Sequence, residues 1–146
     1  IALACALRFC SENAKFGLQD VKWGFHACDG ALVRLPHIVG MGATMELVLS
    51  GELIDAEHAH KINLVNKIYP NNSLLEKTLE YAHLLTKRAP LATKFAKQTL
   101  RNTVSMPIKD ALKHEVRSFY DLGQSEDLAE GTRAFRERRD AKFTGR

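Results

Sequence analysis

The feature that most constrains the fold is a change of hydrophobic pattern at Pro70. Before this proline the chain holds the only segments in which apolar residues alternate, and after it apolar residues recur at helical spacing. Alternation is typical of half-buried strands, whereas a period of 3.6 is typical of helices. The pattern therefore predicts a mixed α/β part over residues 1–70 and a helical part over residues 71–146. No linker between them is long enough to separate two independent domains.

Within the first part, residues 7–25 and 64–69 alternate and are expected to form short strands with turns. Residues 31–49 have the helical period, and Ser50-Gly51 gives the signal for the end of that helix. Asp55 is predicted to be the N-cap of a further short helix that ends near Lys61.

The second part carries clear signals for helix starts. A capping box, two prolines suited to a first helical position and a serine before an acidic pair predict three to four helices. These signals are Ser73 with Glu76, Pro90, Pro107, and Ser125 with Glu126 and Asp127.

Composition is that of an ordinary soluble chain, with 45% hydrophobic and 26% charged residues among 146. The most apolar stretch, residues 41–53, is interrupted by acidic and hydroxyl side chains, so no membrane span is expected. Three cysteines without C-x-x-C spacing indicate neither a disulfide framework nor a zinc knuckle, and favour a reducing compartment. The net charge of +4 favours a phosphate-bearing partner without naming one.

Asp20 is the carboxylate with the strongest functional interpretation. It lies at the rim of an apolar strand and turn region, where desolvation can bring a carboxyl pKa toward the range useful for acid or base catalysis. The structural alternative is an aspartate that bonds to a turn backbone. Asp29 has a stronger structural alternative, as the N-cap of the helix that follows Gly30.

Other reactive side chains give weaker signals. His26 and Cys28 lie close together, but no acid orients the imidazole, so a nucleophilic pair is not expected. His58 and His60 are two residues apart on a predicted helix and cannot share a metal, and no metal site is expected. The basic residues Arg133, Arg136, Arg138, Arg139 and Lys142 indicate either a solvated helix flank or a phosphate contact.

The chain opens on Ile1 in an apolar stretch that has neither a cap nor a basic leader. We expect this stretch to be the middle of a structural element, and the chain to be a portion of a longer protein.

Several motifs follow one another in a distinctive order: Ser11–Gly17, Val21–Gly24, Arg34–Pro36, Val39–Gly40, Met45–Ala56, Leu64–Ile68, and Ser125 to Arg139. Together these motifs resemble the crotonase family, the enoyl-CoA hydratase/isomerase superfamily. The resemblance spans nearly the whole chain and corresponds to the C-terminal half or so of a family member.

The resemblance implies an α/β fold, the C-terminal part of the ClpP/crotonase spiral with short strands, followed by a helical trimerisation region. In that family a thioester carbonyl lies between two backbone N–H groups that stabilise an enolate, while carboxylates move protons and position water. The first of these N–H donors, much of the CoA groove and the first catalytic carboxylate correspond to positions before Ile1. The second catalytic carboxylate, usually Glu after Pro, corresponds to Asp20 after Gln19.

Two departures from the family pattern bear on the chemistry. Asp20 is one methylene shorter than Glu, and catalysis is sensitive to displacements of about 1 Å. The glycine-rich turn of the family becomes Ala27-Cys28-Asp29-Gly30-Ala31. Some relatives, including dienoyl-CoA isomerases and carnitinyl-CoA dehydratases, carry an Asp close to this turn. Asp29 is therefore a candidate second acid only if the turn takes a different path.

The resemblance implies that Phe25, His26 and Asp29 contact substrate, and that Phe119 and Arg138 reach the CoA nucleotide of a neighbouring subunit in a homotrimer or hexamer. It implies an acyl-CoA substrate with no cofactor beyond coenzyme A itself, no nucleic acid and no membrane partner. The expected location is the cytoplasm, or the mitochondrial matrix in a eukaryote.

Hydration of 2-enoyl-CoA thioesters is the first expectation for activity. The alternatives are an enoyl- or dienoyl-CoA isomerase, a carnitinyl-CoA dehydratase-like lyase, and a non-catalytic homologue. Residues 1–146 alone are expected to be inactive, because half of the family's oxyanion hole corresponds to positions outside them.

Overall fold

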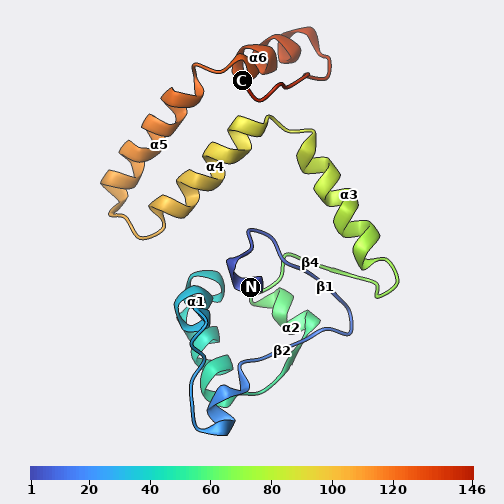
Figure 1. Cartoon of the computed structure of the whole chain (residues 1–146), viewed down its shortest axis with the longest axis vertical. Coiled ribbons are helices and arrows are strands. Elements are labelled where there is room, and N and C mark those ends of the chain that lie inside the picture. The colour runs from blue at the N-terminus through green and yellow to red at the C-terminus, as the bar shows by residue number, and fades with distance from the viewer. The chain divides into compact units, whose positions relative to one another are not determined.

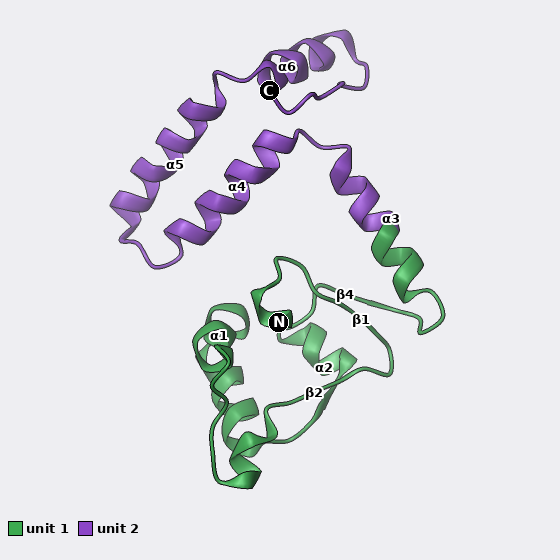
Figure 2. Cartoon of the chain, in the orientation of Figure 1, with its two compact units in different colours: residues 1–79 green, residues 80–146 purple.

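The structure is a computed structural model that describes all 146 residues of the chain. The chain forms two compact units, Ile1–Leu79 and Glu80–Arg146, which divide within one helix (Figure 2). The predicted division at residues 70/71 between a crotonase core part and an oligomerisation region stays a prediction.

The first unit contains short strands and two α-helices (Figure 1). Its elements are η1 (Ala2–Ala4), β1 (Phe9–Ser11), β2 (Lys15–Phe16), η2 (Gln19–Trp23), α1 (Ala31–Ser50), β3 (Ile54–Asp55), α2 (Ala56–Lys61), β4 (Lys67–Tyr69) and the first part of α3 (Leu74–Thr86). Strands β1 and β4 pair in parallel, with Cys10 opposite Ile68. Strands β2 and β3 pair in antiparallel fashion, with Phe16 opposite Ile54.

The predicted extended segment over residues 7–25 is only partly confirmed. Residues 19–23 form the 3-10 helix η2 instead of a strand. Strand β3 has only two residues, so no partner strand faces the chain beyond Phe16. The backbone there satisfies its own polar groups, and the N–H of Gly24 (φ 84°) donates to the carbonyls of Asp20 and Val21.

The two helices of this unit begin and end largely as predicted. Asp55 caps α2, because its carboxylate accepts a hydrogen bond from the His58 N–H at 2.8 Å. Gly51 ends α1 in the left-handed conformation at φ 62°. The N-cap of α1 is Gly30, without a side-chain cap bond, so the predicted Asp29 cap is wrong. Gly30 has a φ of 81°, a conformation that glycine adopts without strain.

Helix α1 is long and apolar enough, by length and composition alone, to cross a membrane, which the sequence prediction had excluded. That prediction considered residues 41–53, whereas residues 31–50 contain only Arg34 and Glu46 as charged side chains. Core helices of soluble proteins and signal sequences meet the same criterion, and 17% of the apolar window is buried in this structure. Gly40 kinks α1 at φ 80° and ψ 164°.

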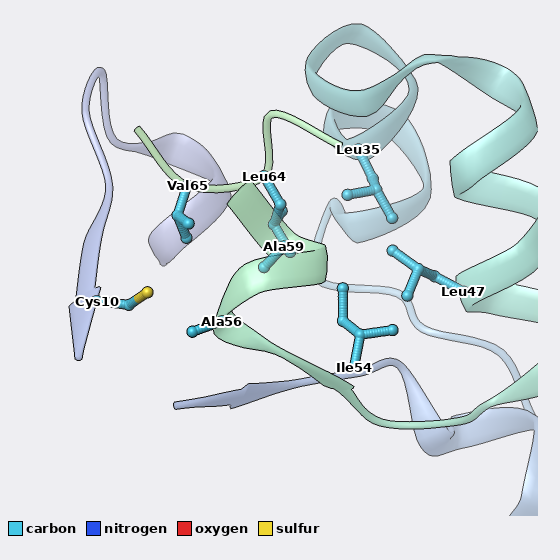
Figure 3. Packing of buried hydrophobic residues seen from close by; sticks show 8 residues of the cluster. All are labelled: Cys10, Leu35, Leu47, Ile54, Ala56, Ala59, Leu64 and Val65. Carbon is cyan, nitrogen blue, oxygen red and sulfur yellow. The ribbon is translucent and has the colours of Figure 1, made fainter. Parts of the chain in front are cut away.

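The core of the first unit lies between α1, α2 and the strands (Figure 3). Leu35 and Leu47 of α1 point toward Ile54, and Ala59 of α2 is fully buried beside them. The small side chains of α2 let this helix approach its neighbours closely. The buried cluster consists of Cys10, Leu35, Leu47, Ile54, Ala56, Ala59, Leu64 and Val65.

The second unit is helical, as predicted. It contains the rest of α3, then α4 (Pro90–Thr103), α5 (Ile108–Leu122) and α6 (Glu126–Glu137). Pro90 occupies the first helical position of α4, Pro107 is the N-cap of α5, and Ser125 caps α6 by accepting from the Leu128 N–H at 3.2 Å. Helices α4 and α5 lie side by side as a hairpin (Figure 1), with the Thr99 hydroxyl donating to that of Ser118 at 2.7 Å.

The residues after α6 fold back along it. Asp127, which is 3% exposed, accepts hydrogen bonds from the backbone N–H groups of Thr144 at 2.7 Å and Gly145 at 3.0 Å. The Asp127 N–H donates to the carbonyl of Arg146 at 3.2 Å. The C-terminal segment is thereby tied to the first turn of α6.

Candidate functional site

Asp20 lies in the first turn of η2 and is half-buried. Its backbone carbonyl accepts from the N–H of Phe25 at 3.4 Å, but its carboxylate makes no hydrogen bond or ion pair with this chain. The side chain therefore does not bond to the turn backbone, which was the structural alternative for it. A carboxylate without a partner in the chain is available to a bound molecule.

The segment after η2 carries the other predicted substrate contacts of this unit. Phe25 is 59% exposed, although it is a large apolar residue. His26 is exposed, and its Nδ1 lies 3.0 Å from the carbonyl of Ala27, its neighbour in the chain. Asp29 is exposed too, and its carboxylate accepts only a weak contact from the Cys28 thiol at 3.9 Å. The structure thus leaves these side chains accessible without joining them into one constellation.

An apolar cavity of about 380 Å³ lies elsewhere in the first unit. None of Asp20, Phe25, His26 and Asp29 lines it. Its wall combines the start of the chain with residues from β1, α1 and the segment before β4: Ala2, Leu3, Cys5, Leu7, Arg8, Phe9, Phe16, Gly17, Leu18, Leu35, Leu47, Leu64 and Val65.

Arg8 is a structural residue that the sequence interpretation missed. Its Nε donates to the Leu64 carbonyl at 2.6 Å and its Nη1 to the Cys5 carbonyl at 2.9 Å. Its backbone exchanges two 2.8 Å hydrogen bonds with Asn66. A charged residue within an apolar stretch was the available signal, but its partners Leu64 and Asn66 lie 56 and 58 residues away along the chain.

All three cysteines are free, and Cys5 and Cys28 are exposed. Burial raises the pKa of the Cys10 thiol, and the nearby charge of Glu57 raises it further. No group of three or more His, Cys, Asp or Glu side chains is placed to hold a metal ion.

In the second unit, Phe119 lies on α5 and is 67% exposed. Arg138 follows α6 as its C-cap, in the left-handed conformation at φ 52°, and its exposed side chain makes no ion pair. Both predicted nucleotide contacts are therefore free to meet a partner outside this unit.

The predicted basic flank of the last helix is not continuous. Helix α6 ends at Glu137, so Arg139 and Lys142 lie beyond it. The guanidinium of Arg139 binds both oxygens of Glu130, at 2.6 and 3.1 Å, and also pairs with Glu137. Arg133 lies 3.6 Å from the same Glu130 carboxylate. Two of the predicted phosphate contacts are thus neutralised within the chain.

Glu130 is the centre of this ion-pair cluster. Hydrogen bonds from the Arg139 side chain and the Lys142 N–H, aided by the charges of Arg139 and Arg133, lower the pKa of Glu130 to about 2. The same pairing raises the pKa of Arg139.

Comparison with known proteins identifies the class of protein to which this chain belongs. The family model described as enoyl-CoA hydratase/isomerase matches residues 1–146. The chain belongs to this family, and its structure has the crotonase-like fold.

Two curated relatives match the entire chain. The 2,3-dehydroadipyl-CoA hydratase of Escherichia coli (strain K12) is 36% identical over 146 residues, and the match covers 57% of that protein. The carnitinyl-CoA dehydratase of Salmonella heidelberg (strain SL476) is 33% identical over 150 residues, and the match covers 58% of it. The chain thus spans a little less than three fifths of the length of these relatives.

Solved structures agree with this match. Crystal structures of an enoyl-CoA hydratase from Bacillus anthracis and of another from Geobacillus kaustophilus HTA426 both superpose with a TM-score of 0.95. Sequence identity is 30% and 35%, respectively, and 99% of this chain is covered in each case. The match takes in 56% and 55% of those chains.

Proposed function

We propose that this chain forms part of an enzyme that hydrates 2-enoyl-CoA thioesters. The observation that carries the proposal is the similarity of the entire chain to a 2,3-dehydroadipyl-CoA hydratase at 36% identity. The half-buried carboxylate of Asp20 also supports the proposal, because it has no partner in the chain and is available for acid or base catalysis.

In this reaction the oxygen of water bonds to C3 of the enoyl group and a proton bonds to C2. Attack at C3 moves the electrons of the double bond toward the thioester oxygen, where backbone N–H groups stabilise the resulting enolate. The role proposed for Asp20 is to take a proton from the attacking water or to return one to C2.

The remaining predicted contacts take supporting roles. Phe25, His26 and Asp29 are proposed to contact the acyl-pantetheine part of the substrate, and Phe119 and Arg138 its nucleotide. Exposure of all five side chains supports this proposal. Coenzyme A enters only as part of the substrate, and no other cofactor is proposed.

A dehydratase acting on a 3-hydroxyacyl-CoA is the second candidate, because carnitinyl-CoA dehydratases at 31–33% identity match the chain over 150 residues. Elimination of water uses the same acid and base in the opposite direction. Double-bond isomerisation is the third candidate, since the family description includes isomerases.

We further propose a homotrimer, or a hexamer built from two trimers, in the cytoplasm or mitochondrial matrix. The support for assembly comes from α5, which exposes an apolar stripe at helical spacing. The stripe consists of Ile108, Leu112, Val116 and Phe119.

Replacement of Asp20 by Asn in the full-length protein that contains this chain tests the proposed function. We expect kcat for hydration of crotonyl-CoA to fall by a factor of about 10² to 10⁴, the usual contribution of a positioned acid or base. The matched control is Glu12→Gln, which neutralises an exposed carboxylate elsewhere in the same unit and should leave kcat unchanged. Full activity in the Asp20→Asn variant would remove this residue from the mechanism.

A further inference from the structure

Two glycines let the backbone around Asp20 approach the turn that follows α1. A Cβ atom at Gly17 would lie 2.9 Å from the carbonyl oxygen of Glu52 and 2.9 Å from Leu53 Cδ2. Real Cβ atoms do not approach other atoms this closely, so only glycine fits at Gly17 without movement of the Glu52 backbone. The chain enters η2 directly after this contact.

Gly51 makes the second close approach, from the other side of the contact. It is buried, and a Cβ on it would lie 3.0 Å from Val21 Cγ2 and 3.2 Å from Lys22 Cγ. Val21 and Lys22 belong to η2 and follow Asp20 directly. Any side chain at Gly51 therefore has to push the Val21 and Lys22 side chains of η2 aside by a few tenths of an ångström, or shift the turn by as much.

Two further interactions join the η2 region to the turn after α1. Pairing of Phe16 with Ile54 leads the chain into Gly17, and Lys22 Nζ lies 2.8 Å from Glu52 Oε1. This ion pair is solvent-exposed and contributes little by itself. The close contacts at Gly17 and Gly51 are a further constraint on the position of η2.

We propose that Gly51 is a positioning residue for Asp20. Because Gly51 has no side chain, η2 packs closely against the turn after α1, and this position of η2 lets the Asp20 carboxylate reach the reacting atoms. This inference rests on the proposed acid/base role of Asp20. The carboxylate has no side-chain partner to orient it, so the seat of η2 is what fixes its position. A displacement of about 1 Å is enough to lower a catalytic rate a hundredfold.

Helix termination alone explains the left-handed backbone of Gly51 but not its contacts. Glycine and asparagine both serve as C-caps with positive φ, and Asn63 adopts a φ of 63° in this chain. Gly24 has a φ of 84° and no atom within 4 Å of the place that a Cβ would take, whereas Gly51 is pressed against Val21 and Lys22. Asparagine at position 51 would thus keep the helix cap but disturb the close packing against Val21 and Lys22.

The test compares Gly51→Asn with Gly145→Asn in the full-length protein. Gly145 also has a positive φ, 78°, but a Cβ there meets Pro90 at an ordinary 3.7 Å. We expect Gly51→Asn to lower kcat for crotonyl-CoA hydration about tenfold to a hundredfold with little change in KM, and Gly145→Asn to change neither. In the Asp20→Asn background, Gly51→Asn should lower kcat no further, because both changes act through one carboxylate.

Fluorescence of Trp23, the one tryptophan of this chain, reports the position of η2 independently of turnover. With the spectrum of a Trp23→Phe variant subtracted, Gly51→Asn should shift the emission and Gly145→Asn should not. If Gly51→Asn does not fold, Lys22→Ala serves instead. It removes the stem that lies over Gly51, and it should lower kcat several-fold whereas Lys22→Met, which keeps a stem, should not.

The outcomes separate this inference from the proposed function. Unchanged kcat in Asp20→Asn, or no hydration by the parent protein, overturns both. Three other results overturn only the positioning role, provided that Asp20→Asn lowers kcat. The first is a Gly51→Asn effect on kcat that adds to that of Asp20→Asn, and the second is an effect no larger than that of Gly145→Asn. The third is unshifted Trp23 emission in Gly51→Asn.

Discussion

Glu130 shows that one carboxylate can occupy the basic side chains that a sequence offers as phosphate contacts. Arginines at three-residue spacing indicated a possible phosphate contact, but Glu130 accepts hydrogen bonds from Nη1 and Nη2 of Arg139 and lies near Arg133. A bidentate arginine is no longer free to bind a phosphate in the same way. Arg138, which lacks such a partner, remains the better candidate for a nucleotide contact.

The depressed pKa of Glu130 predicts how its contribution to stability depends on pH. Since the folded pKa, about 2, lies below the ordinary value of 4.5, the contribution is complete above about pH 5 and is lost as the pH falls toward 2. In urea denaturation followed by far-ultraviolet circular dichroism, Glu130→Gln should be less stable than the parent at neutral pH, and the difference should close between about pH 4.5 and 2. A difference that is constant over this interval would contradict the pairing.

The control for this series is Glu115→Gln, which removes an exposed carboxylate on α5 that has no ion pair. Its stability difference from the parent should be small throughout. Urea is the suitable denaturant, because a denaturing salt would screen the charges under test.

At the scale of elements, Asp127 joins α6 to the segment that follows it. Its buried carboxylate accepts two backbone N–H groups, so Asp127→Asn places an amide N–H₂ against at least one of these donors. We expect a loss of about 1–3 kcal/mol in the free energy of unfolding, the cost of a buried donor left without a partner. Asp140→Asn, an exposed change in the same segment, should cost less than about 0.5 kcal/mol.

Proteolysis gives a second measurement of the same connection. Release of the segment should make the peptide bond after Lys142 more sensitive to trypsin in Asp127→Asn than in Asp140→Asn. Equal stability and equal cleavage of the two variants would show that the two hydrogen bonds do not hold the segment in place.

The elements most accurately predicted from the sequence are those with local causes. Asp55, Pro90 and Ser125 mark helix starts through hydrogen bonds or φ values that involve their immediate neighbours, and the structure confirms all three. Residues 19–23 were mistaken for a strand, because strand formation depends on a partner that alternation alone does not reveal.

The candidate site likewise has features that the sequence could predict and features that it could not. Asp20 could be selected from its apolar surroundings and from the family resemblance, and its catalytic role stays a prediction; its carboxylate has no partner in the chain. The close approach of Gly51 to Val21 could not be predicted, because it joins residues about thirty positions apart. Nor could the neutralisation of Arg139, which depends on where α6 ends.

At the scale of the whole molecule, the chain matches 57% of the length of a 2,3-dehydroadipyl-CoA hydratase. Stabilisation of an enolate by two backbone N–H groups is the largest single contribution to catalysis of this type, and loss of one such donor costs a factor of about 10² to 10³ in rate. The family resemblance assigns one donor to residues before Ile1. We therefore expect residues 1–146 alone to hydrate crotonyl-CoA at no measurable rate.

Addition of the segment of a relative that the match does not cover should give an active enzyme if this chain supplies a competent part of the site. A chimera that joins the preceding segment of the 2,3-dehydroadipyl-CoA hydratase to residues 1–146 provides the test, with its Asp20→Asn variant as the matched control. Hydration by the chimera and not by the variant would support a functional Asp20. Turnover by residues 1–146 alone would contradict the requirement for two N–H donors from separate halves. An inactive chimera that nevertheless folds and assembles would favour the non-catalytic alternative, because every other part of the hydratase site would then be present.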